Sequence, residues 1–301
     1  MGNQDYIVKK LRHIEILPTF PKIVSEILTL INDPMSSASD LARHMDPSMA
    51  GEVLRVANTA YFGTRNFRSI TTMERAIAVI GYEHLGYVVL QMPFLALVQG
   101  PDTTFDRKLF ITHAIVCGSL AKLIGSHATV AVDHNEIYIS GILHDIGRII
   151  LYRYFKKEWQ EMLLLIRERH MPAVEAERAI FSVDHGYVGA SLLELWNLPS
   201  AICDGVRYHH TPGAAPQNRE SAFATCLANQ FAKRINMDTD LECFDDFATR
   251  HRDFCEAVNG STDAITVHDE VRFLSLAYDS LKNAQGLIEV TAGDHDTGSC
   301  G

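Results

Sequence analysis

Apolar residues recur at helical spacing along almost the whole chain, and this periodicity limits the fold more than any other feature. The segment FPKIVSEILTLIND has the pattern of an amphipathic helix, with apolar residues at intervals of three and four: Ile23, Ile27, Leu30 and Ile31. No segment alternates apolar and polar residues as a half-buried strand would, and no unit repeats along the chain. The sequence therefore predicts an all-α fold.

Two local signals indicate where helices in the N-terminal part begin and bend. Asp46 is an expected N-cap, and Pro47 stands at the first helical position, where its missing N–H costs nothing. Residues 69–98 read as two helices that meet near Gly81.

The polar segment QGPDTTFD, residues 99–106, lies between two apolar helices and contains both Gly and Pro. We place the main boundary there, between an N-terminal helical subdomain (1–100) and a helical bundle (105–287). Residues 288–301 are expected to form a disordered tail. Residues 238–262 are acidic and weakly patterned, which predicts a short helix plus loops. Helices in the bundle are expected, within about two to four residues, at 105–125, 133–154, 156–170, 172–182, 185–196, 199–210, 218–236 and 268–287.

Charge and composition argue against several functional classes. The net charge of −10 and the absence of a basic run exclude a broad nucleic-acid surface, which needs clustered Lys and Arg. No apolar stretch reaches the roughly 18–20 residues of a membrane helix, so no membrane partner is expected. The N-terminus MGNQDYIVKK lacks the apolar core of a signal peptide. None of the six cysteines is spaced as CxxC, which indicates free thiols. We expect a cytoplasmic protein.

The segment GILHDIGRIIL, residues 141–151, places His144 and Asp145 side by side in an apolar run. A buried carboxylate is costly without a partner. A divalent metal is one possible partner, and histidine with carboxylate suits zinc, iron or manganese. An equally weighted alternative is an Asp145 that caps a helix or pairs with Arg148 or Arg153.

Other histidines lie on inward or small-residue faces of separate helices. His113 lies on an apolar stripe, His185 stands near the start of a helix with small residues one turn away, and His209 and His210 end an apolar helix. Each alone is explained by a core hydrogen bond, a first-turn position or the dipole at a helix C-terminus. Together they match the way helical bundles converge ligands on one point. The sequence thus predicts a site for one or two ions of iron, zinc or manganese, with these candidate ligands: His113, His144, Asp145, His185, His209, His210 and, as a poorer ligand, Asn229.

These residues also carry a resemblance. His113 and His144-Asp145 resemble the HD superfamily of metal-dependent phosphohydrolases, and His185 with His209-His210 look like the extra ligands of its two-metal branch, the HD-GYP phosphodiesterases. Over roughly residues 13–235 the chain is similar to the HDOD family, in the segments LPTFPKIVSEILTLINDP, DPSMAGEVLRVANTAYFG, ITTMERAIAVIG and VGASLLELWNLPSAICDGVRYHHTP. The resemblance implies an N-terminal helical subdomain packed on an HD-type bundle, in a bacterial protein of signalling and regulation whose HD site is often degenerate.

The chain departs from both patterns at three places. Asn229 stands where the HD superfamily has its last Asp, and Leu109 stands where the HD-GYP branch has a Glu ligand. Thr211-Pro212 follow the histidine pair in place of the Glu and Gly-Tyr-Pro segment of HD-GYP enzymes. These departures argue against hydrolysis of cyclic dinucleotides of the HD-GYP kind.

Two functions follow as expectations. The first is a signalling protein with a retained but partly degenerate metal site that acts by binding other signalling proteins. The alternative is an active metal-dependent phosphohydrolase on a nucleotide, cyclic nucleotide or other phosphoester, with Asp145 holding metal. A cation should then hold the substrate phosphate, and the candidates are Arg148, Arg207 and Lys122.

Overall fold

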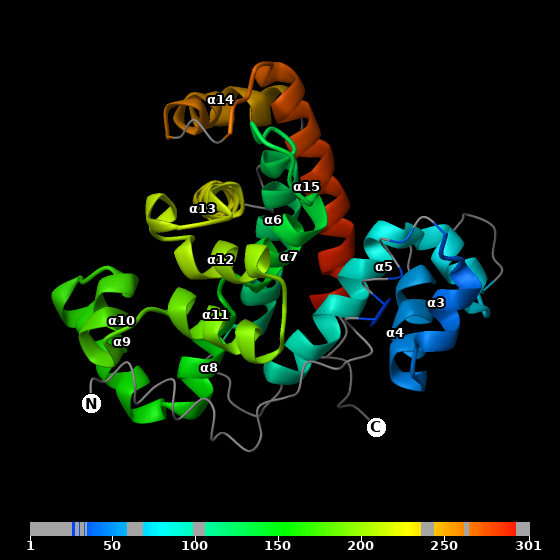
Figure 1. The fold of residues 1–301 in the computed structure, drawn as a ribbon, viewed down its shortest axis with the longest axis horizontal. Helices are drawn as coiled ribbons and strands as arrows, with labels where there is room; N and C mark the ends of the chain where they lie inside the picture. Colours follow the sequence, from blue (N-terminus) through cyan, green and yellow to red (C-terminus); the bar gives the residue numbers. More distant parts are fainter. Residues whose placement is uncertain are drawn as a thin grey trace. The chain divides into compact units, whose positions relative to one another are not determined.

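The structure is a computed structural model that describes residues 35–58, 69–98, 106–235, 244–261 and 265–292, together with residues 26, 27, 30 and 33 (Figure 1). Helices make up most of this part of the chain, and within it the only β-type pairing is an isolated antiparallel bridge between Ala128 and Ile265. The prediction of an all-α fold is confirmed. The helix expected around Ile23 lies largely outside the described residues.

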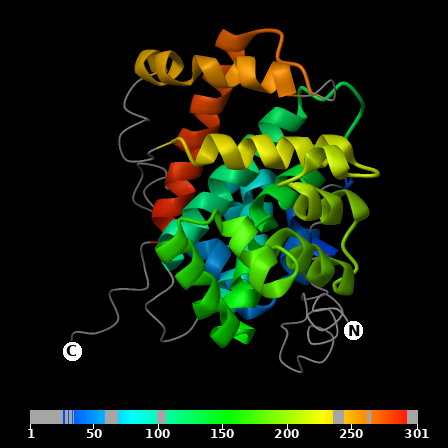
Figure 2. The same cartoon turned by 90° about the vertical axis from the view of Figure 1, so that its left-hand side faces the viewer.

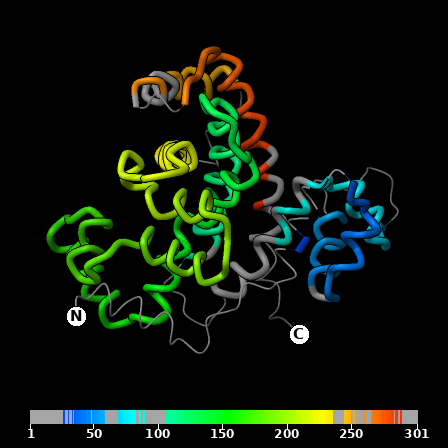
Figure 3. The backbone as a smooth tube through the Cα atoms, in the orientation of Figure 1, coloured from blue at the N-terminus to red at the C-terminus, as the bar shows by residue number. Residues whose placement is uncertain are grey.

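The backbone divides into two compact units, and Figure 3 follows its course through both. Among the described residues, one unit contains those between Lys108 and Gln285, and the other contains those between Ile16 and Arg107 and those from Gly286 to Ala292. In this part of the chain the change between the units falls between Arg107 and Lys108, and the extents expected from the sequence, 1–100 and 105–287, stay predictions. Residues 99–105 themselves lie outside the described part of the chain.

The described residues of the unit that begins at Ile16 include the helices α3 (Ala38–His44), α4 (Pro47–Ala57) and α5 (Met73–Val98). The Asp46 carboxylate accepts a hydrogen bond from the amide of Met49, and Pro47 stands in the first turn of α4, as predicted. Helix α5 is interrupted at Gly81, whose φ of 77° favours glycine. The expected meeting of two helices near this residue is therefore confirmed.

The other unit is a helical bundle in which α12 contacts α7, α11 and α13, while α11 also packs on α8 (Figures 1 and 2). Together with α6 and α10, these five helices supply the residues of the candidate site described below. The elements of the bundle are α6 (Arg107–Gly125), α7 (His134–Leu143), α8 (Ile146–Tyr154), α9 (Lys156–Arg169), α10 (Ala173–Phe181), α11 (His185–Leu195), α12 (Ser200–Tyr208), the short 3₁₀ turn η1 (Pro212–Ala214), α13 (Arg219–Ala232), α14 (Phe244–Ser261) and α15 (Glu270–Ala292).

Three sequence expectations about these elements are corrected. The single helix expected over 133–154 is divided into α7 and α8 at His144-Asp145, because the chain turns there to bring both side chains inward. Within the segment 238–262, the described residues 244–261 form one long helix, α14, which buries Phe247 against Phe231. Helix α15 continues to Ala292, past the expected end at residue 287. Residues 293–301 of the expected tail lie outside the described residues.

Helix α6 contains a window, Lys108–Gly125, that is long and apolar enough to cross a membrane by composition alone. This window corrects the expectation that no apolar stretch reaches the length of a membrane helix. In the structure 61% of this window is buried, and it contributes Ile115, Cys117 and Leu120 to the core of the bundle. Its apolar character is therefore explained by packing.

Two glycines allow the helices around the site to approach closely. A Cβ on Gly147 of α8 would overlap the carbonyl oxygen of His185 on α11. A Cβ on Gly141 of α7 would lie 2.8 Å from the carbonyl oxygen of Cys117 on α6. Because real Cβ atoms do not come so near to backbone atoms, only glycine fits at either position.

Candidate metal centre

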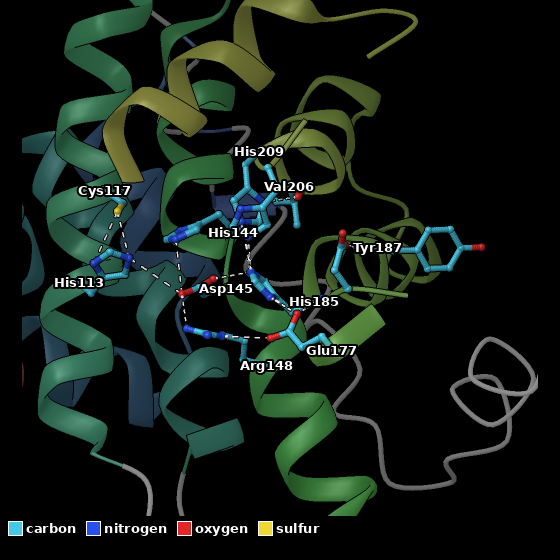
Figure 4. Close-up of polar contacts among 12 residues, drawn as sticks. His113, Cys117, His144, Asp145, Arg148, Glu177, His185, Tyr187, Val206 and His209 are labelled. Carbon is cyan, nitrogen blue, oxygen red and sulfur yellow. Dashed lines mark hydrogen bonds and ion pairs between the residues drawn. The ribbon is translucent and has the colours of Figure 1, made fainter. Parts of the chain in front are cut away.

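The His144-Asp145 pair occupies the break between α7 and α8 (Figure 4). Asp145 is in the N-cap position of α8, yet its side chain makes no capping hydrogen bond and is only 5% exposed. Helix capping therefore does not explain this residue. Its carboxylate does lie 3.6 Å from Nη1 of Arg148, so one part of the ion-pair alternative is present.

Three imidazole rings also face the Asp145 carboxylate. Nε2 of His185 lies 2.9 Å from Oδ1, and Nε2 of His144 lies 3.6 Å from Oδ2. Nε2 of His113 is further away, at 4.0 Å from Oδ2. These rings come from α6, the α7–α8 break and the start of α11, so separate helices converge on one carboxylate (Figure 4).

In His144 and His209, the ring nitrogen that points away from the site, Nδ1, is held by an oxygen acceptor. Nδ1 of His144 donates to the carbonyl of Gly141 at 2.7 Å, and Nδ1 of His209 donates to the carbonyl of Val206 at 2.6 Å. Because a carbonyl oxygen can only accept, Nδ1 of each ring carries a proton, and Nε2 of the neutral ring presents its lone pair to the site. Metal-binding histidines in proteins are usually anchored in this way.

Glu177 of α10 is the third anchor, and the sequence analysis missed it. It is fully buried, and its Oε2 accepts hydrogen bonds from both Nδ1 (2.6 Å) and the backbone N–H (2.9 Å) of His185. Its other oxygen lies 3.5 Å from Nε of Arg148. A carboxylate behind a histidine fixes the ring orientation and raises its basicity as a ligand. The sequence did offer one signal: Glu177 lies next to Ala176 and one helical turn before Phe181, which places a charged residue on the apolar face of its helix.

Nitrogen atoms crowd together on the α12 side of the site. Nε2 of His185 lies 3.2 Å from Nε2 of His209 and 2.9 Å from Nε2 of His210. The rings of His209 and His210 are adjacent, with centroids 3.9 Å apart. One imidazole nitrogen has either one proton or one lone pair, so it cannot satisfy the Asp145 carboxylate and two other nitrogens at once. A cation shared by these donors resolves the conflict.

Burial and charge together set the protonation of these groups. Burial alone would raise the pKa of Asp145, but His144, Arg148 and His185 hold it well below its usual range. Burial would lower the pKa of His185, but Asp145 and Glu177 raise it to about 9. For His209, burial and the charge of His185 lower the pKa to about 4. At neutral pH the site thus contains an ionised Asp145, a neutral His209 and a His185 that carries a proton, which a metal would have to displace in order to bind Nε2.

The α6–α13 side of the site is less regularly anchored. His113 is 19% exposed at its side chain, and burial lowers its pKa. Asn229 of α13 is buried, and its Oδ1 has no hydrogen-bond partner among the described residues. Leu109, which stands where the HD-GYP branch has a Glu ligand, is 65% exposed, so this position does not direct a side chain into the site.

The three cations named from the sequence are each engaged by other residues. Arg148 lies between the carboxylates of Asp145 and Glu177, which raise its pKa against the opposing effect of burial. Arg207 pairs with Glu194 at 2.6 Å and stacks over the ring of Tyr187. Lys122 donates to Asn135 Oδ1 at 3.4 Å.

The donor set fits a divalent metal by its chemistry. Two overlapping groups have ligand atoms that all lie within 4.8 Å of one another: His144, Asp145 and His209, and His185, His209 and His210. Nε2 of His144 is wholly buried without a hydrogen-bond partner in the described part of the chain. An orphaned nitrogen of this kind is explained if a cation occupies the space in front of it. Imidazole with carboxylate suits zinc, iron or manganese.

The fold and the site together define an all-α protein with a buried carboxylate that is surrounded by histidines from separate helices. The chain belongs to the HDOD family, because the model of the HDOD domain matches residues 17–212. A curated relative from Treponema pallidum, itself uncharacterised, is 27% identical over 240 residues, which cover 76% of this chain and 44% of that protein. The chain thus spans less than half the length of this relative.

Solved structures with the same fold come from several bacteria. An HDOD domain protein of unknown function from Geobacter sulfurreducens is 21% identical, with a TM-score of 0.71 over 95% of this chain and 97% of that one. A candidate phosphohydrolase from Shewanella amazonensis has a TM-score of 0.67 at 19% identity, over 95% of this chain and 100% of that one. A candidate signal transduction protein from Marinobacter aquaeolei has the same score and identity, over 95% of this chain and 65% of that one. At such identities these similarities show the fold alone.

Proposed function

We propose that this protein is a signalling or regulatory module whose HD-type site binds a divalent metal, and that it acts by contacting other signalling proteins. The observation that carries the metal part is the set of anchored histidines around Asp145. Nδ1 of His144, His185 and His209 is held by an oxygen acceptor, so Nε2 of each ring is the nitrogen that would bind a cation, which on His185 would displace a proton.

The preference for a regulatory role rests on what the site lacks as a hydrolase. Asn229 supplies a neutral amide where an HD enzyme has a carboxylate. Arg148 is already paired with two carboxylates, so a substrate phosphate would have to compete for it. The name of the Marinobacter aquaeolei protein agrees with a role in signalling.

A second function has one specific observation in its favour. The three nitrogens of His185, His209 and His210 form a complete ligand group that does not depend on Asn229. A metal bound there would lower the pKa of bound water and polarise a phosphoryl oxygen. On this alternative the chain acts on a phosphoester, with Asp145 and the anchored histidines holding the metal in place. The Shewanella amazonensis protein is named as a candidate for this activity.

Metal analysis of purified protein tests the proposal. Wild type should contain about one or two equivalents of zinc, iron or manganese, and Asp145→Asn should lose most of it. Asp133→Asn is the matched control, because Asp133 is an exposed N-cap of α7 and Asn caps nearly as well. Metal-free wild type, or equal metal in all three proteins, would contradict the proposal.

Hydrolysis assays then separate the two functions. Metal-loaded wild type should leave bis(p-nitrophenyl) phosphate and p-nitrophenyl phosphate intact. Asn229→Asp restores a carboxylate at the α13 position. If the alternative holds, wild type turns over one of these substrates, and Asn229→Asp is faster.

A further inference from the structure

Cys117 brings a sulfur atom to the side of the site that Asn229 leaves without a charge. It lies one helical turn after His113 on α6, is fully buried, and places Sγ 3.5 Å from Nε2 of His113. The ligand atoms of His113, Cys117 and His144 all lie within 4.8 Å of one another. From the sequence alone, Cys117 is predicted only to be one of six free thiols.

A second observation at the same place points to a ligand. Nε2 of His144 is completely buried and has no hydrogen-bond partner among the residues that the structure describes. Its Nδ1 is already used by the carbonyl of Gly141, so the ring cannot turn to satisfy Nε2 without losing that bond. The free nitrogen belongs to the same donor group as the Cys117 sulfur, in a space that Asp145 also borders.

The spacing of these atoms suits zinc. Zinc–sulfur bonds of about 2.3 Å and zinc–nitrogen bonds of about 2.0 Å place a sulfur and a nitrogen roughly 3.5 Å apart in a tetrahedral site. The observed separation of Sγ and Nε2 of His113 is 3.5 Å. The separations from Asp145 Oδ2 to His144 and His113 are 3.6 and 4.0 Å, which shifts of a few tenths of an ångström would bring to tetrahedral values.

We propose that Cys117 is a metal ligand, and that with His113 and His144 it forms a thiolate-containing position selective for zinc. The proposal rests on the metal site proposed above and adds a ligand to it. The thiolate supplies the negative charge that the amide of Asn229 lacks. On binding, the S–H bond breaks, the sulfur bonds to the metal and the proton leaves to solvent. Soft thiolate ligands favour zinc over manganese or magnesium.

The competing explanation is that Cys117 only packs in the core, with a weak contact to the histidine one turn before it. X-ray absorption of zinc-loaded wild type decides between the two without any substitution. A sulfur neighbour at about 2.3 Å is expected, and a shell of nitrogen and oxygen alone would overturn the proposal. Cobalt substitution gives a second readout, because a thiolate ligand adds charge-transfer absorption in the near ultraviolet.

Variants extend the test. Cys117→Ser should lose the sulfur neighbour and the charge-transfer absorption, and bind zinc at least tenfold more weakly. Cys226→Ser is the matched control, since Cys226 is also buried but its sulfur contacts Gln230. If Cys117→Ser and Cys226→Ser both keep the spectrum of wild type, Cys117 is not a ligand, while metal lost only from Asp145→Asn would still support the site. If wild type binds no metal, both proposals fail.

Discussion

Glu177→Gln tests the second layer of the candidate site with almost no change in shape. Oε2 of Glu177 accepts two hydrogen bonds from His185, and Oε1 faces Arg148. A glutamine with its oxygen in the Oε2 position keeps both bonds to His185 as neutral ones. Its amide nitrogen then faces Arg148, donor against donor. The substitution thus removes charge while it leaves volume and position intact.

The expected cost follows from these contacts. A hydrogen bond to a charged group contributes about 1.5–3 kcal/mol and a neutral one about 0.5–1.5 kcal/mol, so two bonds lose roughly 2 kcal/mol in the metal-free protein. The Arg148 pair adds little, because the Arg148 side chain is 32% exposed and its attraction is screened. For the metal, loss of an outer-shell partner typically weakens affinity about 10–100-fold. We expect a weakening in this range for zinc.

Competition between a proton and the metal for His185 changes zinc affinity in the opposite direction, so its effect must be measured separately from that of ring orientation. Burial lowers the pKa of His185, but Asp145 and Glu177 raise it to about 9, so at neutral pH a proton competes with metal for Nε2. Glu177→Gln reduces that competition, which partly masks the loss at pH 7. At pH 9 the competition is weak in both proteins, and the loss due to ring orientation should appear in full.

Chelator-competition titration of zinc at pH 7 and pH 9 measures both effects. Glu175→Gln is the matched control, because Glu175 is an exposed residue on the same helix. Unchanged zinc affinity of Glu177→Gln at pH 9 would refute the idea that this carboxylate orients a metal ligand. An equal loss in Glu175→Gln would show that the effect is one of general charge.

Three further predictions concern stability, measured by urea unfolding in the presence of chelator. Stability should fall by up to about 3 kcal/mol as pH rises from 6.5 to 9. The pKa of His185 is about 6.5 in the unfolded chain and is raised to about 9 in the folded protein, so its stabilising effect is complete below pH 6.5 and is lost as pH rises to 9. A stability that does not change with pH in this range would contradict the prediction. Gly147→Ala should destabilise the protein by more than about 3 kcal/mol, since the new Cβ would overlap backbone atoms of α11. Gly51→Ala has open space around it and should be neutral or stabilising by up to about 1 kcal/mol. Similar changes in stability for the two variants would refute the packing argument. Asn58→Ala should cost about 2 kcal/mol, because Asn58 bonds both the N–H and the carbonyl of buried Ile70, and a loss below about 0.5 kcal/mol would count against that role.

Local chemistry made helix starts the most predictable part of the fold. Asp46-Pro47 was identified as the start of a helix because an N-cap and a first-turn proline act within a few residues, and the structure has that cap. The break at His144-Asp145 was missed for the opposite reason. Apolar residues continue in helical register on both sides of it, so periodicity cannot reveal that the chain turns. The turn depends on close packing at Gly141 and Gly147, which involves residues distant in sequence.

The same distinction applies to the site. The candidate ligands could be named because histidines on apolar faces are unusual, and the structure brings the group from α6 to α12 around Asp145. Glu177 could not be placed there from spacing alone. Its contact with His185 depends on the end of α10 at Phe181, where the C-cap residue Ser182, with a φ of 63°, turns the chain so that α11 begins beside the Glu177 carboxylate. A single residue in the left-handed region decides this geometry.

The cations around the site bear most directly on whether the protein hydrolyses a phosphoester. A phosphohydrolase must offer its substrate a positive group that is free when the substrate arrives. Arg148 is the sequence candidate that lies at the site, and it pairs with Asp145 and Glu177, one a candidate metal ligand and the other the anchor of His185. A phosphate that recruited Arg148 would take its charge from both carboxylates and leave them less well compensated in a buried setting. Because Arg148 is already engaged by both carboxylates, these contacts oppose the recruitment of a phosphate, and this supports the proposed regulatory module over the proposed phosphohydrolase.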